Sequence, residues 1–194
     1  MSLDESMIHD IVQKVMANMQ IAGSVEGMHG VFQDMNDAIK ASIEAQKVVR
    51  NLSLDQREKI IAAIRRKTHE NAEIIANMGV NETGMGNVGD KILKHHLTAD
   101  KTPGTEDLST IAWSGDRGLT LVEMGPFGVI GAITPATNPS ETVICNSIGM
   151  IAAGNTVVFN PHPNAKKTTI FTINMINEAS LEAGGPDNIA VTVE

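Results

Sequence analysis

Apolar and polar residues are distributed differently in two parts of the chain, and the change falls near residue 125. Residues 1–124 hold 18 of the 23 acidic residues and 13 of the 15 basic residues, interleaved with apolar positions. Between residues 125 and 165 the only formal charge is Glu141. The first part therefore predicts amphipathic helices with one solvated face, and the second predicts the core of a larger sheet.

Four helices are predicted in the first part, because apolar residues recur there at intervals of three or four. They cover residues 35–50, 54–67, 70–82 and 88–101. The second helix begins with Ser53-Leu-Asp-Gln56, a capping box in which each side chain bonds the backbone of the other residue.

A β-hairpin is predicted after these helices. Residues 111–114 and 119–123 flank Gly115-Asp-Arg-Gly118, a turn-forming sequence between two short strands.

Strands and helices alternate through the rest of the chain. β-Branched and apolar segments predict the strands, and glycines mark the ends of the helices between them. In chain order the elements are strand 127–134, helix 139–153, strand 156–160, helix 165–183 and strand 189–193. This alternation implies parallel strands joined by right-handed crossovers, so the predicted fold class is α/β.

The N-terminal residues carry a single apolar stripe on a short predicted helix. The stripe consists of Ile8, Ile11, Val12, Val15, Met16 and Met19. Residues 22–30 contain three glycines and predict a linker. Two interpretations stay open: the segment packs back on the body or ends a disordered tail, or it docks into a groove of another protein.

Composition and charge exclude several classes of function. The 194 residues suffice for one domain or a large piece of one, and the net charge of −8 argues against binding nucleic acid or anionic lipid. Five aromatic residues make base stacking improbable, and a single cysteine excludes a disulfide framework, which favours a reduced cytoplasm. The longest uncharged run, 142–165, is broken by asparagine, glycine and proline, so no membrane span is predicted.

Two segments lie where a ligand would bind. In an open parallel sheet, ligands bind beyond the carboxyl ends of the strands, and residues 134–138 and 160–163 follow two predicted strands directly. Both are stiffened by proline. The glycines at 125, 128 and 131 do not form the dinucleotide fingerprint G-x-G-x-x-G.

Five residues need weighing against structural roles. Asn138 precedes Pro139 at a predicted helix start, so capping alone can explain it. His162 lies between two prolines, where an imidazole is expected neither to cap nor to pack on a helix; a structural hydrogen bond and a ligand contact both stay open. His95 and His96 point in different directions on a helix and make a poor metal pair, and no metal site is predicted. Cys145 lies among apolar residues and is predicted to be a core thiol.

A series of short motifs resembles one family in order and spacing. The motifs are Glu82-Thr-Gly-Met-Gly86 with Asp90-Lys91, Thr102-Pro-Gly104, Gly125-Pro-Phe-Gly-Val-Ile130, Thr134-Pro-Ala-Thr-Asn-Pro139, Ala152-Ala-Gly-Asn155, and Pro161-His-Pro163 with Ala165-Lys-Lys167. They resemble the CoA-acylating aldehyde dehydrogenases of bacterial microcompartments, which oxidise propionaldehyde or acetaldehyde. The resemblance covers the chain from about residue 30 to its end and implies an aldehyde-dehydrogenase-like fold with an incomplete Rossmann-like sheet.

The resemblance implies an NAD-linked oxidation of a short-chain aldehyde through an acyl-enzyme, with coenzyme A taking the acyl group. It assigns Ile133, Thr134, Pro135, Ala136 and Thr137 to the nicotinamide half of the cofactor, and Asn160, Pro161, His162 and Pro163 to the adenosine half. Either Thr137 or Asn138 would serve the oxyanion. Ordinary aldehyde dehydrogenases have a lysine at the position of Asn160 and a serine at the position of His162.

The resemblance also implies how the chain is organised. Family members are more than twice as long, and their nucleophilic cysteine lies in the C-terminal half, so this chain is expected to be an inactive N-terminal portion. The expected divisions are a shell-targeting helix at 1–21, a linker at 22–30, a helical cover at 31–108, an oligomerisation hairpin at 109–124 and the first part of the dinucleotide-binding domain at 125–194. The expected setting is a cytoplasmic microcompartment, with a shell protein as partner and a homo-oligomeric enzyme. A non-catalytic cargo or interaction fragment that keeps the fold is the alternative.

Overall fold

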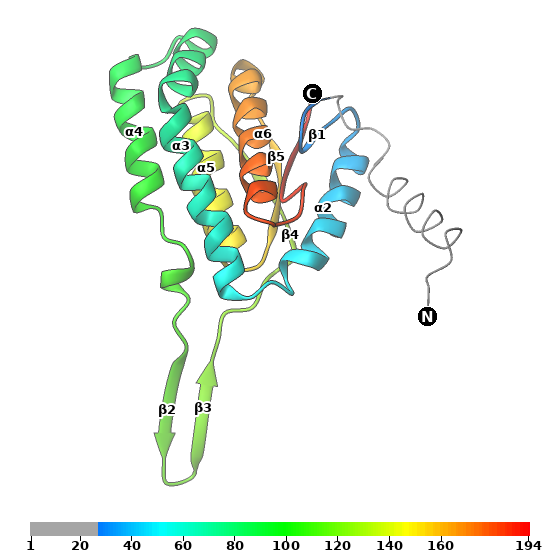
Figure 1. Ribbon diagram of the computed structural model, residues 1–194, viewed down its shortest axis with the longest axis vertical. Coiled ribbons are helices and arrows are strands. Elements are labelled where there is room, and N and C mark those ends of the chain that lie inside the picture. Colours follow the sequence, from blue (N-terminus) through cyan, green and yellow to red (C-terminus); the bar gives the residue numbers. More distant parts are fainter. Residues whose placement is uncertain (1–26) are drawn as a thin grey trace, which may run out of the picture.

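A parallel sheet of four strands forms the centre of the molecule, as the computed structural model describes it for residues 27–194 (Figure 1). The strands are β1 (Val31–Phe32), β4 (Val129–Ile133), β5 (Thr156–Asn160) and β6 (Ala190–Val193), in the order β1-β6-β5-β4. All three pairings are parallel. The predicted α/β class is therefore confirmed.

Strand β1 is the element that the sequence analysis missed. The chain was expected to supply three strands, but Val31 and Phe32 add a fourth beside Thr192 and Val193. Two residues are too few to show an alternating pattern. Gly30 permits the approach: its φ is +73°, and a Cβ there would collide with the Asn177 side chain.

The segment predicted as a linker, residues 22–30, contacts the body at its C-terminal end. Residues 27–30 belong to the body, because the His29 backbone N–H donates to Asn174 Oδ1 (2.7 Å) and its ring Nδ1 lies 2.9 Å from Asp187.

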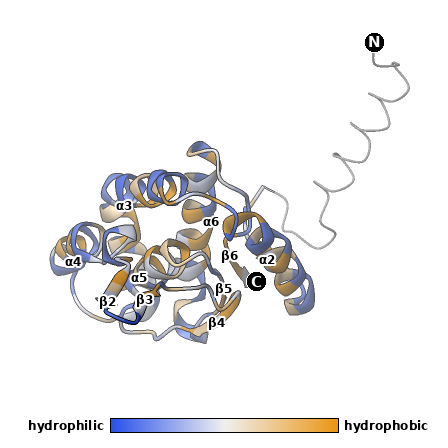
Figure 2. Cartoon of the chain, turned by 90° about the horizontal axis from the view of Figure 1, so that it is seen from below, coloured by the Kyte–Doolittle hydropathy of each residue, from blue (hydrophilic) through white to orange (hydrophobic). Residues whose placement is uncertain are grey.

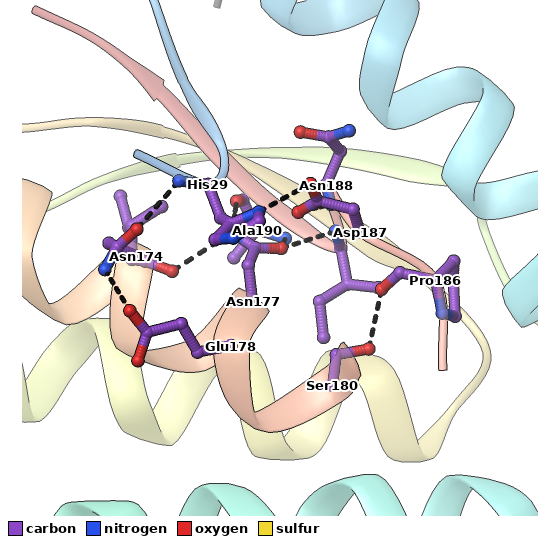
Figure 3. A network of polar contacts seen from close by, with 11 residues as sticks. His29, Asn174, Asn177, Glu178, Ser180, Pro186, Asp187, Asn188 and Ala190 are labelled. Atoms are coloured by element: carbon purple, nitrogen blue, oxygen red, sulfur yellow. Dashed lines mark hydrogen bonds and ion pairs between the residues drawn. The ribbon is translucent and has the colours of Figure 1, made fainter. Parts of the chain in front are cut away.

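Figure 3 shows how this region is joined to helix α6 (Lys166–Glu182) and to the start of strand β6. Buried Asn177 donates through Nδ2 to the carbonyl oxygens of Ile173 and Ala190 and accepts through Oδ1 from Ile189 N. One side chain thus satisfies backbone groups of both α6 and the start of β6, which fixes their separation.

The helices lie in layers on the two faces of the sheet (Figure 2). Helix α2 (Met35–Val49) covers one face, and α5 (Pro139–Ala152) and α6 (Lys166–Glu182) cover the other. Helix α3 (Leu54–Thr83) packs outside α5 and α6, and α4 (Val88–Lys101) packs on α3 and α5. Alternation along β5 supplies both interfaces: Val157 and Phe159 join the core with α3, α5 and α6, whereas Val158 joins the α2 side.

Helix α3 is one helix of 30 residues, where two helices at 54–67 and 70–82 were expected. Neither glycine nor proline interrupts it at the expected break, and Thr68 is buried with its hydroxyl donating to Ile64 O. Packing against α4 and α6 extends the helix beyond what the local pattern indicated. The capping box of Ser53 and Gln56 is confirmed.

The hairpin of β2 (Ile111–Gly115) and β3 (Gly118–Val122) is also confirmed, with Gly115 paired to Gly118. It projects from the body at the lower end of Figure 1, and all ten of its strand residues are exposed. Strand β4 begins at Val129 rather than at 127; Phe127 is 95% exposed.

Candidate functional site

The two predicted ligand loops begin side by side. Strands β4 and β5 are in parallel register with Ile133 opposite Asn160, and the Thr134 N–H donates to the Asn160 carbonyl oxygen (3.1 Å). The loops 134–138 and 160–163 therefore leave the same edge of the sheet, as the sequence analysis expected.

Exposure differs among the residues assigned to cofactor contacts. The exposed ones are Ile133, Pro135, Thr137, Asn160, His162 and Pro163; Pro161 is half-buried, and Thr134 and Ala136 are buried. The Thr134 hydroxyl has no hydrogen-bond partner among residues 27–194. The structure thus brings an exposed apolar side chain, Ile133, and an unpaired buried hydroxyl together at the end of β4.

A buried ion pair braces the first loop from helix α4. Lys91 Nζ donates to the Thr137 carbonyl oxygen (2.7 Å) and lies 3.2 Å from Glu141 Oε1. Only 5% of the Lys91 side chain and 8% of the Glu141 side chain are exposed. Removing a charge from water costs roughly several kcal/mol per ion. The close geometry of the pair and the extra hydrogen bond to the loop offset this cost.

A second buried contact joins α4 to the start of α5. His95 Nε2 lies 2.8 Å from Ser140 Oγ, and Ser140 Oγ donates to Glu141 Oε2 (3.1 Å). Burial lowers the pKa of His95, while the neighbouring Glu141 carboxylate partly opposes this effect. His95 is therefore neutral near neutral pH, and His96 points elsewhere, stacking on His69. The two histidines do point apart, as expected.

Asn138 does not cap helix α5 through its side chain, so the capping interpretation is wrong. Its φ and ψ are −140° and 63°, outside the extended region in which capping residues usually lie, and its side chain accepts no bond from the first helical N–H groups. Instead, Lys94 Nζ donates to Asn138 Oδ1 over 3.0 Å. Asn138 Nδ2 makes no hydrogen bond to any residue in the range 27–194. A short amide donor is thus left free at the edge of the site.

A cavity of about 390 Å³ lies beside Asn138, between α4 and α5. Its lining combines apolar and polar groups: Lys94, Leu97, Thr98, Asn138, Glu141, Thr142, Cys145 and Asn146. Cys145 was predicted to be a core thiol, but it is only half-buried and lines this cavity. Its Sγ lies 3.1 Å from Thr102 Oγ1. The apolar neighbours that suggested a core lie on the other sides of the helix.

The second loop is held by local contacts. His162 Nδ1 accepts from Asn164 N (3.1 Å) and so caps the short 3-10 helix of residues Pro163–Ala165. The expectation that this imidazole has no capping role is wrong. Its ring remains exposed, so a ligand contact through Nε2 is sterically open.

The N-terminus of α6 is occupied by a carboxylate from α3. Glu82 accepts from the backbone N–H groups of Lys167 (2.7 Å) and Thr168 (2.8 Å) and from the Thr168 hydroxyl (2.7 Å). Backbone donors of this kind commonly bind phosphate. Here they are satisfied within the chain, so this helix end offers no further phosphate site, in keeping with the absent glycine fingerprint.

Sequence reasoning gave no role to Lys91, Lys94, His95 or Glu82. Glu82 and Lys91 stand in the motifs that carried the family resemblance, which was the only available signal. The partners of all four residues are 44 to 86 residues away along the chain, so no local pattern could reveal these contacts.

Two further findings bear on function. None of the helices in residues 27–194 combines the length and apolar character needed to cross a membrane. Over the same residues no group of three or more histidine, cysteine, aspartate or glutamate side chains is arranged to hold a metal ion.

Comparison with known proteins assigns this chain to a family. The profile described as the aldehyde dehydrogenase family matches residues 15–193, nearly the whole chain. The chain belongs to the aldehyde dehydrogenase family. The predicted family resemblance is confirmed at this level.

Several acylating aldehyde dehydrogenases are similar to this chain. An acetylating acetaldehyde dehydrogenase of Bilophila wadsworthia is 45% identical over 98% of this chain. A propionaldehyde dehydrogenase from the fucose utilisation microcompartment of Clostridium phytofermentans is 73% identical, with a TM-score of 0.84 over 86% of this chain and 38% of its own. The Rhodopseudomonas palustris propionaldehyde dehydrogenase, solved with bound CoA and an acylated cysteine, is 50% identical, with a TM-score of 0.83 over 85% of this chain and 38% of its own. The chain spans about 41% of the length of the Bilophila relative.

Proposed function

We propose that this chain is the N-terminal part of an enzyme that oxidises a short-chain aldehyde with NAD and transfers the acyl group to coenzyme A. The observation that carries the proposal is the free amide donor of Asn138, which lies at the carboxyl end of β4 and borders the cavity between α4 and α5. High identity to acylating propionaldehyde and acetaldehyde dehydrogenases supports it.

The sheet edge fits a nicotinamide cofactor in two respects. Exposed Ile133 offers an apolar surface, and the buried Thr134 hydroxyl lacks a partner among the described residues. We assign residues 133–137 to the nicotinamide half and residues 160–163 to the adenosine half. When bound, the nicotinamide would accept a hydride from the substrate. Residues of this chain would orient it, and the occupied N-terminus of α6 leaves its phosphates to other groups.

Asn138 would stabilise the oxyanion that forms when a cysteine thiolate adds to the aldehyde. Thr137 is the weaker candidate, because its carbonyl oxygen is bound by Lys91 and its exposed side chain does not line the cavity. The aldehyde would occupy the cavity of about 390 Å³, where Leu97 and Cys145 provide apolar surface. Cys145 is not assigned as the nucleophile, because it lies within helix α5 and hydrogen-bonds Thr102.

Turnover by the complete protein tests this function. With propionaldehyde, NAD and CoA, the complete enzyme should form NADH and propionyl-CoA, whereas residues 1–194 alone should form neither. A Cys145→Ala variant of the complete enzyme is the control. Loss of the acyl-enzyme in that variant would show that Cys145 is the nucleophile and would overturn the assignment.

Binding experiments test the cofactor loops. We expect NAD and CoA to compete for the complete protein, since both are assigned to the loops that leave β4 and β5. His162→Ala should weaken at least one of them. Unchanged calorimetric affinities for both ligands would remove His162 from the site.

The N-terminal segment is proposed to direct the enzyme to a microcompartment shell in the cytoplasm. Residues 1–21 lie outside the described residues, so this rests on their apolar stripe and on the microcompartment origin of the Clostridium relative. Fusing residues 1–22 to a fluorescent protein should give punctate fluorescence in a compartment-forming cell. The same pattern from a Val15→Asp control, or diffuse fluorescence from both, would count against targeting.

We also propose a homo-oligomeric enzyme that uses the hairpin. Leu119 and Leu121 are 65% and 59% exposed on one face of it, which is costly for a ribbon surrounded by water. Leu121→Asp should lower the mass of the complete enzyme in analytical ultracentrifugation, while Arg117→Ser at the turn should not. A non-catalytic cargo would show the same assembly without turnover, which separates the two candidate functions.

A further inference from the structure

The chemistry of the Lys94–Asn138 contact fixes the orientation of an amide. A lysine ammonium group carries only donors, so the atom that it contacts at 3.0 Å must be the amide oxygen of Asn138. The amide nitrogen then points the opposite way. An asparagine without such a partner could exchange its oxygen and nitrogen by a rotation of its terminal torsion, which has a broad, two-fold profile.

Helix α4 is held firmly enough to give this contact a defined place. Lys91, one turn before Lys94, is bound to the Thr137 carbonyl and to Glu141, and His95 is bound to Ser140. These buried contacts connect one face of α4 to both sides of Asn138. The loop backbone and the helix are therefore bonded to each other on both sides of Asn138, and Lys94 makes an exposed contact to Asn138 from this helix.

We propose that Lys94 is a positioning residue that holds Asn138 in the orientation in which Nδ2–H can donate to the oxyanion. The inference rests on the proposed function. It gives the oxyanion role to Asn138 rather than Thr137. Lys94 lines the same cavity but acts through the Asn138 amide oxygen. The positive charge on the amide oxygen also polarises the N–H groups and makes them better donors.

The kinetic consequence is specific to the chemical step. An oxyanion donor acts on the transition state more than on the bound aldehyde, so its misorientation lowers kcat and leaves KM nearly unchanged. Removing such a donor costs about 100-fold in kcat or more. Misorienting it through Lys94→Met should cost about tenfold, equivalent to about 1.4 kcal/mol.

The first experiment measures kcat and KM for propionaldehyde in the complete enzyme. Lys94→Met should lower kcat about tenfold with KM little changed, and Lys94→Arg, which keeps the donor charge, should restore most of the rate. Lys101→Met is the matched control, an exposed lysine on the same helix without a bonded partner in residues 27–194, and it should leave both constants unchanged. In an Asn138→Ala background, Lys94→Met should have no further effect. An equal loss in both backgrounds would overturn the proposal.

The second experiment observes the amide itself in the complete enzyme. With isotope-labelled asparagine, the Asn138 side-chain NH₂ resonances are identified by their loss in Asn138→Asp. Lys94→Met should shift them and Lys101→Met should not. Unchanged resonances in Lys94→Met would overturn the contact even if the enzyme is active. Shifted resonances in a protein without turnover would keep the orientation and overturn the proposed function instead.

Discussion

The two loops that follow strands β4 and β5 are held in different ways. Residues 134–138 are braced from outside by α4, through a Lys91–Glu141 pair whose side chains are 5% and 8% exposed. Residues 160–163 are shaped by their own prolines and by His162, which caps a turn only two residues away. Both follow strands in direct register, so the difference does not come from the sheet.

Under the proposed function, this difference separates a loop that positions a donor from a loop that binds a cofactor. A loop that presents a donor to a reacting atom must keep its geometry within a fraction of an ångström, and a rigid support from a neighbouring helix provides that. A loop that borders a cofactor needs shape and exposure, which prolines supply locally. The buried ion pair therefore has its clearest reason in geometry, since buried pairs contribute little net stability over apolar residues.

The largest expected effect on stability comes from breaking the Lys91–Glu141 ion pair. Lys91→Met leaves the buried Glu141 carboxylate without its counter-ion and should lower the free energy of unfolding by about 3–5 kcal/mol. Urea denaturation of the 194-residue chain, followed by circular dichroism, measures this. A loss as small as that of the exposed-site variant Lys101→Met would show that the pair is not a structural brace.

A double substitution sharpens the same comparison. Lys91→Met with Glu141→Met removes both charges and should recover much of the lost stability, because no unpaired charge remains. The Thr137 carbonyl loses its donor in both variants, so we expect catalysis by the complete enzyme to stay impaired. Full recovery of activity would mean that Lys91 serves stability alone.

A moderate effect on the free energy of unfolding is expected when the pH is lowered. Burial lowers the pKa of His95 in the folded chain, so the unfolded chain binds a proton there more readily. Stability from this group is complete above the unfolded pKa of about 6.5 and declines as the pH falls below it. His95→Gln should therefore reduce the loss of unfolding free energy between neutral pH and mildly acidic pH. His162→Gln, at an exposed imidazole, is the control; equal slopes in wild type and His95→Gln would contradict the prediction.

The smallest effect is expected in the second loop. His162→Ala removes one solvent-exposed capping hydrogen bond and should cost less than about 1 kcal/mol of stability. The same denaturation series measures it. A cost close to that of Lys91→Met would mean that the two loops are supported alike and would remove the contrast between them.

Local patterns predicted most of the elements. The helices α2 and α4, the hairpin and strand β5 were expected within a residue or two, because each has its own apolar period or turn signal. Strand β1 was missed, and α3 was divided in two, because a two-residue strand has no period and because packing extends α3 across a weak point in its pattern.

By itself, the sequence determined the α/β class, the carboxyl-end position of the two loops and the family, since each depends on order and spacing along the chain. Tertiary structure alone decided what Asn138 and Cys145 do. Asn138 is bound by a lysine 44 residues earlier rather than capping its own helix, and Cys145 lines a cavity rather than the core. The physical reason is that a side chain takes the best partner in space, and partners brought together by packing leave no mark on the local sequence.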